Sequence, residues 1–366
     1  MITRAQFKNI ILYLFLGIFF LYPFRVEPNT SFQLYQYCMA CFATLVILLE
    51  FRTIYSMLRS KPFVYLLFFT ITTTFINAYY FSIYRDSRFL IDLSFYLIYL
   101  IIAVYSFLLI NENRIKQILF LSTLVLLPTL AYLLFFNIGS EFNTATYNNK
   151  NQLAQWAFYL AVFSVFTDLK TKRDRIIKVI VFTGAICISS ITITRAVTFS
   201  VCISLIYLFF TDMRSFLMVI LISLFLLTLH YSLNSTHFDQ TVQKIESKYL
   251  KSNSKYDTFM GRGYWRILAF PSSIIFGKGE RMHRERFDDP YEIHSSYGNL
   301  LFAYGLIGIS MLFLFYQFFF SKISYDLIII ISVLFLSFFH NIFKSPFIMV
   351  LPVLYYYRNN SKITKF

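Results

Sequence analysis

Residues 117–136 read QILFLSTLVLLPTLAYLLFF, an apolar run without a charged side chain. A helix needs about 20 predominantly apolar residues to cross a bilayer, where it must satisfy its own backbone hydrogen bonds. This run therefore predicts a transmembrane helix. Similar runs recur along the chain, and together they predict an all-α, polytopic integral membrane protein.

Twelve such apolar segments can be delimited. They cover residues 9–24, 33–50, 63–83, 89–110, 117–136, 152–167, 177–193, 196–211, 215–231, 295–320, 327–340 and 345–357. Hydrophobic residues make up 58% of the chain and charged residues 14%, whereas charged residues are about a quarter of a soluble domain. We therefore predict about twelve transmembrane helices: nine within 1–231, a long outer loop over 232–293, and three within 294–366 ahead of a cytoplasmic tail.

Lysine and arginine are distributed unequally between the two predicted sides. The side that includes both termini carries 17 of the 33, the short gaps of the other side carry 6, and the long polar segment carries 10. Basic residues in short loops mark the cytoplasm, while long loops translocate whatever their charge. Both termini are therefore predicted to be cytoplasmic. The net charge of +15 follows from this bias and suits anionic lipid, so it gives no reason to expect a nucleic-acid partner.

The long loop contains a stretch rich in arginine and aromatic residues. Its sequence is GRGYWRILAFPSSIIFGKG at 261–279, which includes Arg262 and Arg266, and Arg281 follows shortly after. Planar guanidinium groups bind phosphate through paired hydrogen bonds, so arginines at the outer face suit a lipid-linked phosphate or diphosphate. The alternative is a charged loop that is merely solvated, and the charge pattern by itself favours that alternative.

Two ionisable residues lie at predicted junctions with the membrane. His294 stands where the polar loop meets the segment 295–320, and Arg195 stands just before 196–211. Ionisable groups at membrane depth are costly and point to function. Each residue could also be an interface anchor.

Four motifs resemble the bacterial O-antigen polymerase and O-antigen ligase superfamily. They are TRA at 194–196, the GR…W…FGKG stretch within 261–279, HSSYGNLLFAYGLIGI at 294–309, and NNKNQLAQWAF at 148–158 around Asn151. The histidine motif is the most specific of them. The first part of the chain contributes only its topology to the resemblance.

The resemblance implies a GT-C-like membrane enzyme of the bacterial inner membrane that acts at the periplasmic face. Such an enzyme transfers a glycan from undecaprenyl diphosphate to a sugar hydroxyl, without a cofactor or a catalytic metal. The resemblance implies catalytic roles for His294, Arg195 and Arg262, and substrate-binding roles for Arg266, Arg281 and Asn151. In this chain the tryptophan follows Arg262 by three positions instead of the usual four, so Arg266 is an alternative to Arg262.

Rival functions share much of this pattern. Within the superfamily, a polymerase joins lipid-linked repeat units, a ligase transfers glycan to lipid A core, and an oligosaccharyltransferase transfers it to protein. We favour the polymerase because the chain is short and its outer loop is modest. A chain-length regulator would be a further partner. From another class, a flippase for a lipid-linked sugar would gather the same substrate, but such transporters often contain internal repeats, and none is evident here.

Overall fold

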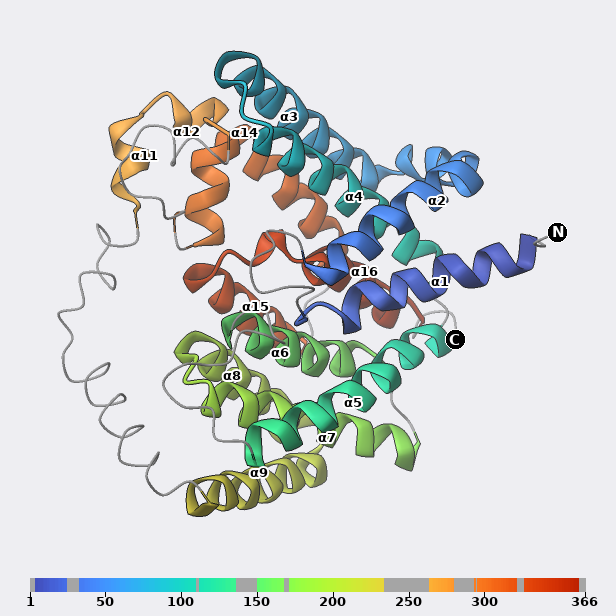
Figure 1. The fold of residues 1–366 in the computed structure, drawn as a ribbon, viewed down its shortest axis with the longest axis vertical. Coiled ribbons are helices and arrows are strands. Elements are labelled where there is room, and N and C mark those ends of the chain that lie inside the picture. Colours follow the sequence, from blue (N-terminus) through green and yellow to red (C-terminus); the bar gives the residue numbers. More distant parts are fainter. Residues whose placement is uncertain are drawn as a thin grey trace. The chain divides into compact units, whose positions relative to one another are not determined.

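The structure is a computed structural model that describes residues 4–24, 33–109, 112–135, 150–167, 171–233, 263–279, 293, 295–320 and 326–361. The regular elements among these residues are helices, and no strand occurs in the described part of the chain (Figure 1). In chain order they are α1 (Arg4–Phe20), α2 (Leu34–Leu58), α3 (Lys61–Tyr84), α4 (Arg88–Leu109), α5 (Glu112–Phe135), α6 (Lys150–Phe166), α7 (Lys172–Ile191), α8 (Arg195–Thr211), α9 (Met213–Leu233), α11 (Trp265–Ala269), α12 (Ser273–Phe276), α14 (Ser296–Phe319), α15 (Leu327–Phe339), the 3₁₀ helix η1 (Ile342–Lys344) and α16 (Pro346–Ser361). Each of the twelve apolar segments of the sequence coincides with one of the helices α1–α9 and α14–α16.

Six of the described helices are long and apolar enough to cross a membrane. They are α2, α3, α4, α5, α9 and α14, and their apolar windows contain at most two charged residues. Four shorter apolar helices, within α1, α8, α15 and α16, accompany them. These helices indicate an α-helical, multi-pass membrane protein.

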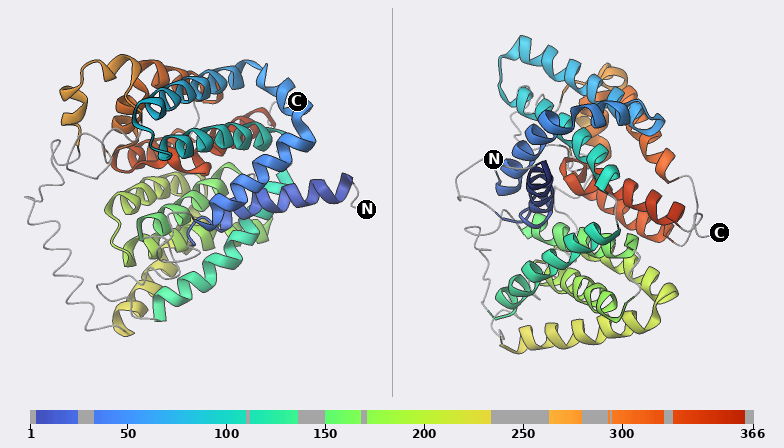
Figure 2. Two further views of the ribbon diagram at one scale, coloured as in Figure 1. Left: turned by 45° about the horizontal axis from the view of Figure 1, so that its top comes forward. Right: turned by 90° about the vertical axis from the view of Figure 1, so that its right-hand side faces the viewer.

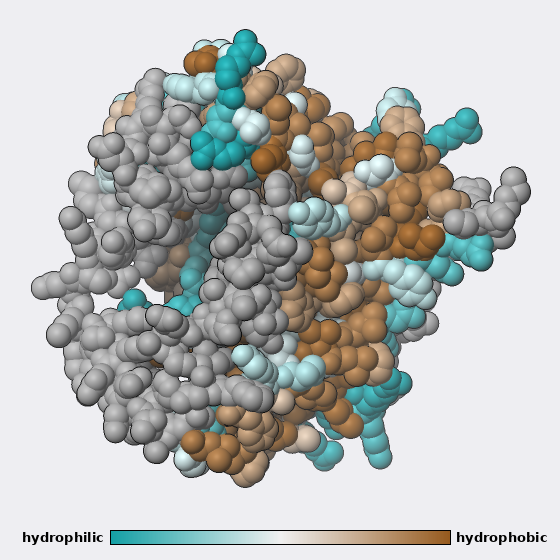
Figure 3. Space-filling view, viewed as in Figure 1, coloured by the Kyte–Doolittle hydropathy of each residue, from teal (hydrophilic) through white to brown (hydrophobic). Residues whose placement is uncertain are grey.

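Large apolar side chains lie on the outside of these helices. Phe75 of α3 is 72% exposed and Phe225 of α9 is 67% exposed. Figure 3 shows hydrophobic residues gathered over the helices on one face of the molecule. Soluble monomers rarely expose apolar surface on this scale, and lipid would cover it in a membrane.

Local sequence explains where several helices begin and end. Helix α7 begins with a capping box, in which the Thr171 side chain accepts a hydrogen bond from the Asp174 backbone and the Asp174 carboxylate accepts one from the Thr171 backbone. Helix α3 ends at Arg85, which adopts a left-handed conformation (φ 56°) and donates its N–H to the Phe81 carbonyl. Such caps satisfy backbone groups that a helix end leaves unpaired.

The described helices fall into two compact units. Unit 1 comprises Met1–Phe42, Ile110–Ser252 and Ile323–Leu336, and unit 2 comprises Ala43–Leu109, Asn253–Lys322 and Ser337–Phe366. In unit 1, α6 is the core helix: every residue from Gln152 to Phe166 is buried, and it packs against α5, α7 and α8. In unit 2, α3 packs against α4 and α14, and α16 packs against α4 (Figure 2).

Candidate functional site

The structure describes three of the six residues predicted for the site. Asn151 and Arg195 belong to unit 1, and Arg266 belongs to unit 2. The other three, His294, Arg262 and Arg281, lie outside the described residues.

In unit 2, helix α14 is interrupted at Gly305, whose backbone has φ 64° and ψ −171°. The carbonyl of Phe302 accepts a hydrogen bond from the Lys278 N–H (2.8 Å), and that of Ala303 accepts one from the Gly279 N–H (2.9 Å). In a continuous α-helix these carbonyls would bond to the N–H groups four residues later. The FGKG segment of the long loop is thus docked on the interrupted helix through the backbone.

Two glycines make this close approach possible. Gly277 has φ +80°, and a Cβ atom there would overlap the Ala303 carbonyl oxygen. A Cβ at Gly305 would overlap the Ile275 carbonyl oxygen. Both glycines also adopt positive φ values that other residues rarely tolerate. The sequence thus contains one glycine on each side of the docked contact, one in FGKG and one in the YGLIG part of the histidine motif.

The two halves of α14 fold toward each other at the interruption. The Phe343 ring lies 6.3 Å from the Tyr297 ring and 5.9 Å from the Tyr316 ring, so those two tyrosine rings are at most about 12 Å apart. In a straight helix, at 1.5 Å per residue, the Cα atoms of these tyrosines would be separated by about 28 Å along the axis, farther than two tyrosine side chains could bridge. Gly305 therefore converts one apolar segment into two half-helices.

A small apolar cluster attaches the loop segment to unit 2. Its buried members are Phe89 of α4, Ile267 of α11, Ile293 and Phe302 of α14. Aromatic side chains of α3 and of the loop segment itself complete it. Helices α11 and α12 pack against α14 (Figure 1). The segment from Gly263 to Gly279 is thus packed on the helices and is not simply a solvated loop.

Arg266 is buried within this segment, with 1% of its surface exposed. Its guanidinium carbon lies 5.6 Å from the centre of the Trp265 ring. A Cβ built on Gly263 would lie 3.6 Å from Arg266 Nη1 and 3.7 Å from Ile293 Cγ1, so Gly263 lies next to both side chains. Gly263 follows Arg262 in the chain and Ile293 precedes His294, so the packing joins the chain neighbours of two predicted catalytic residues.

The start of α14 is tied to the connection between α15 and α16. The Ser295 hydroxyl caps the helix and accepts from the Gly298 N–H at 3.4 Å. The Ser296 hydroxyl donates to the His340 carbonyl at 2.7 Å and accepts from the Ile342 N–H at 2.7 Å. One serine side chain therefore links the first turn after His294 to a distant segment of the chain.

Polar residues that the sequence motifs did not select also lie in unit 2. Asn77 of α3 donates from Nδ2 to the Tyr304 hydroxyl at 3.3 Å, and a Cβ at Gly279 would lie 3.4 Å from Asn77 Oδ1.

Asp92 of α4 is buried. The Nδ2 of Asn299 is buried without a hydrogen-bond partner among the described residues. Asp92 carried an available signal, because it is the one charged residue of the segment 89–110 and ionisable groups at membrane depth are by default functional candidates.

In unit 1, a tight turn places Arg195 at the first position of α8. Ile193 has φ 54°, and the turn is closed by hydrogen bonds from the Thr194 backbone and hydroxyl to the Ser189 carbonyl (3.0 and 3.2 Å). Arg195 is half-buried. A cation at the positive end of a helix is unfavourable by itself. The role of Arg195 toward a diphosphate stays a prediction from the sequence.

Asn151 lies at the exposed start of α6, and its neighbours fix that end of the helix. Gln152 Nε2 donates to the Tyr22 carbonyl (3.1 Å) and Trp156 Nε1 donates to the Phe19 carbonyl (2.8 Å). The Phe19 carbonyl is one of the last carbonyls of α1, which have no N–H partner within the helix. The asparagine motif therefore joins α6 to the end of α1.

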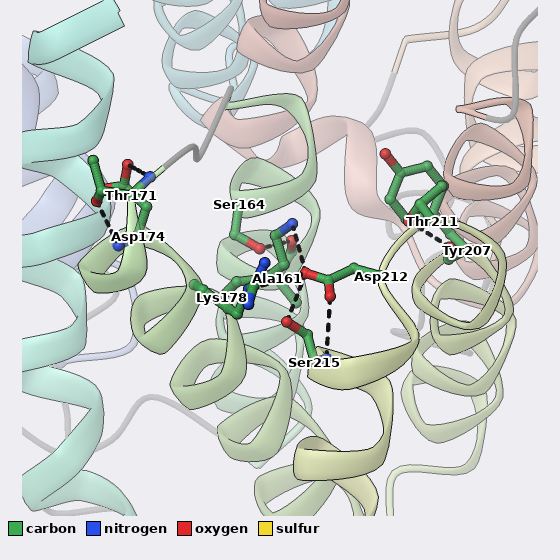
Figure 4. A network of polar contacts seen from close by, with 10 residues as sticks. Ala161, Ser164, Thr171, Asp174, Lys178, Tyr207, Thr211, Asp212 and Ser215 are labelled. Atoms are coloured by element: carbon green, nitrogen blue, oxygen red, sulfur yellow. Dashed lines mark hydrogen bonds and ion pairs between the residues drawn. The ribbon is translucent and has the colours of Figure 1, made fainter.

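A polar network of unit 1 lies around the starts of α7 and α9 (Figure 4). Asp212 accepts from the Ser215 hydroxyl (2.7 Å) and backbone N–H (3.2 Å), and it lies 3.8 Å from Arg175 Nε and 3.9 Å from Lys178 Nζ. Burial alone would raise the pKa of Asp212, but the Ser215 hydrogen bonds and the two cations outweigh it and lower that pKa.

Asp174 is held in a similar way. Burial acts to raise its pKa, but hydrogen bonds from Thr171 and the charge of Lys116, whose Nζ lies 3.6 Å away, lower that pKa overall. These carboxylates and cations pair with one another, which accounts for the network as a structural one.

Within the part of the chain that the structure describes, no three His, Cys, Asp or Glu side chains are grouped to hold a metal ion. Comparison of the chain with protein-family models, with curated proteins and with solved structures gives no match. The resemblance to the O-antigen enzymes therefore rests on the sequence motifs.

Proposed function

We propose that the protein is an O-antigen polymerase of the bacterial inner membrane. It would transfer a glycan from undecaprenyl diphosphate to a sugar hydroxyl of another lipid-linked repeat unit, at the periplasmic face. Its twelve apolar helices would cross the membrane with both termini in the cytoplasm, and the segment 232–293 would be periplasmic. The basic start of α7, with Lys172, Arg173 and Arg175, suits a cytoplasmic end.

The observation that carries this proposal is the docking of one motif on another in unit 2. The FGKG backbone bonds to Phe302 and Ala303, inside the histidine motif, and Gly263 lies next to Ile293. A solvated loop would need neither contact. The contacts support a built site, because they join segments that carry an arginine and a histidine of complementary chemical roles.

The chemistry follows from the residue types. The acceptor hydroxyl attacks the anomeric carbon, the bond between that carbon and the diphosphate oxygen breaks, and the electron pair leaves with the diphosphate. His294 would take the hydroxyl proton, since imidazole titrates near neutral pH. Arg195 and Arg262 would stabilise the charge that develops on the leaving group. One direct displacement inverts the anomeric configuration, and no step needs a metal ion.

The remaining predicted residues receive supporting roles. The burial of Arg266 between Gly263 and Trp265 favours a positioning role, in which its guanidinium holds the turn that follows Arg262. The contact with diphosphate would then belong to Arg262. Arg281 and Asn151 would bind substrate at the loop and at the entrance of α6.

The test is glycan transfer by purified protein in liposomes. Undecaprenyl-diphosphate repeat units would be supplied alone and then with lipid A core, to wild type, His294→Ala and the matched loop control His283→Ala. We expect ladders of lipid-linked glycan from repeat units alone, made by wild type and by His283→Ala and lost in His294→Ala. Transfer only in the presence of core would indicate the ligase instead. Equal ladders from His294→Ala would overturn the catalytic assignment.

The interruption of α14 favours one alternative of another class. Transporters often contain helices broken within the membrane, so a flippase for the lipid-linked repeat unit is the second candidate. A flippase would move a repeat-unit lipid that carries a fluorescent label between the two leaflets of the liposome, without forming a glycosidic bond. Ladder formation in the same liposomes separates the two functions.

A further inference from the structure

The starts of α5, α7 and α9 come together at one end of unit 1 and form a basic surface there. Lys116 Nζ of α5 lies 3.6 Å from Asp174 Oδ2 of α7. Arg175 and Lys178 of α7 both approach Asp212, which directly precedes α9 (Figure 4). These contacts hold the three helix starts side by side. The described cations at this end form what we call the basic cluster: Lys116, Lys172, Arg173, Arg175, Lys178 and Arg214.

The basic cluster carries more positive charge than its carboxylates neutralise. Its six cations are accompanied by two described carboxylates, Asp174 and Asp212, which leaves an excess of four positive charges. Lys172 and Arg214 take part in none of the ion pairs that the structure describes, and both residues are exposed. The network explains the paired cations, whereas the excess charge faces the surroundings of the protein.

Exposed apolar side chains accompany these two exposed cations. Residues four apart on a helix lie on the same face, so Ile176 shares a face of α7 with Lys172, and Met218 shares a face of α9 with Arg214. Ile176 is 55% exposed and Met218 is 44% exposed. Each of the two cations therefore has an exposed apolar side chain one turn further along its helix.

Arg173 shows the same combination across two helices. Its guanidinium carbon lies 4.6 Å from the centre of the Phe120 ring of α5, and both residues are exposed. Positive charge and apolar surface thus meet on α5, α7 and α9. Cations alone would suffice for a free anion, whereas a phospholipid joins a phosphate to acyl chains and can use both kinds of surface.

We infer that the basic cluster binds the phosphate of an anionic phospholipid, whose acyl chains lie against Phe120, Ile176 and Met218. Guanidinium groups bind phosphate through paired hydrogen bonds, and Arg173 and Arg214 supply two such groups. A basic residue near an anionic membrane surface contributes about 5-fold in affinity. The inference goes beyond the proposed function and uses none of the residues assigned to glycan transfer.

The alternative is that these cations serve topology alone, as lysine and arginine in short cytoplasmic loops generally do. Arg52 of α2 and Lys61 of α3 offer a matched control for that alternative. Both are exposed, both belong to unit 2, and both lie in the predicted cytoplasmic gap between the apolar segments 33–50 and 63–83. A general effect of surface charge would respond equally to the loss of either pair of cations.

The experiment compares phosphatidylglycerol with phosphatidylcholine of the same acyl chains. The proteins are wild type, Lys172→Gln/Arg214→Gln, the charge-conserving Lys172→Arg/Arg214→Lys and the control Arg52→Gln/Lys61→Gln. Each is purified in a neutral detergent and titrated with each lipid, and native mass spectrometry gives the number of bound lipids and their Kd. Competition by inorganic phosphate at constant ionic strength tests for a free anion. Thermal unfolding in phosphatidylcholine nanodiscs checks the fold.

We expect wild type to prefer phosphatidylglycerol, and Lys172→Gln/Arg214→Gln to raise the Kd for that lipid about 25-fold, which is 5-fold for each cation. The charge-conserving variant and the control should bind as wild type does, with unfolding temperatures unchanged in phosphatidylcholine. An equal loss of affinity in the control would reduce the effect to general surface charge and refute the inference, and displacement of the lipid by inorganic phosphate would make the ligand a free anion. Equal affinity of wild type for the two lipids would also refute it, whichever variants fold.

Discussion

Gly277 and Ala303 are separated by 26 positions in the chain, and their backbones meet so closely that a Cβ at Gly277 would overlap the Ala303 carbonyl oxygen. The contact attaches the FGKG segment to the interrupted helix α14. Every role proposed for the loop residues depends on it.

Gly277→Ala should detach this segment. The left-handed backbone alone costs about 1–2 kcal/mol for a residue with a Cβ, and the overlap with backbone cannot be relieved by a side-chain movement. We expect faster proteolysis of the loop and a large loss of glycan transfer. The control is Gly17→Ala, because a Cβ at Gly17 would meet only side-chain atoms at 3.5 Å or more. Normal transfer by Gly277→Ala would contradict the docking.

The two loop arginines should respond differently to substitution. Arg266 is buried, so Arg266→Lys should lower both thermal stability and glycan transfer, because the ammonium group cannot replace a packed, planar guanidinium. Arg262→Lys should lower transfer and leave the unfolding temperature unchanged. Unfolding in detergent and transfer in liposomes measure the two effects, and the reverse pattern would make Arg266 the diphosphate ligand.

Helices α5 and α7 pack closely at Gly184 and Leu126. A Cβ at Gly184 would lie 2.7 Å from Leu126 Cδ2, so Gly184→Ala should destabilise unit 1 by about 1–3 kcal/mol through overpacking. In the double variant with Leu126→Ala the new methyl group occupies part of the vacated space. The double variant should therefore lose less stability than the sum of the two single variants, by about 0.5–3 kcal/mol. Strict additivity in equilibrium unfolding would show that the contact is absent.

The network around Asp212 should make stability depend on pH in the acid range. Its pKa is lowered in the folded protein, so the ionised carboxylate stabilises the fold above the ordinary aspartate pKa of about 3.9. This stabilisation is lost as the pH falls through the lowered folded value. Asp212→Asn should therefore unfold at a lower temperature than wild type near neutral pH, and the difference should shrink below about pH 4. A difference that stays constant between neutral and acid pH would argue against the network.

The proposed orientation can be checked by chemical labelling. With the four native cysteines replaced by serine, a membrane-impermeant maleimide should label Ser252→Cys in intact spheroplasts. The same reagent should label Asn113→Cys only after the membrane is opened. Labelling of Asn113→Cys in intact spheroplasts would invert the proposed topology.

Hydropathy along the chain is enough to place the helices and to assign the chain to a membrane. All twelve apolar segments coincide with helices, because within a membrane a long, predominantly apolar run has no better way than a helix to satisfy its backbone hydrogen bonds. Motif spacing also selected His294, Arg262 and Arg195, but those assignments stay predictions.

How the segments of unit 2 meet could not be read from any local pattern. Hydropathy treats 295–320 as one apolar segment, whereas Gly305 divides α14 into two half-helices. The carbonyls of Phe302 and Ala303, next to this interruption, accept hydrogen bonds from the FGKG backbone. Ser296 and His340 likewise come together through a hydrogen bond across 44 positions. Such contacts depend on which surfaces approach closely, and that is a property of the packed chain.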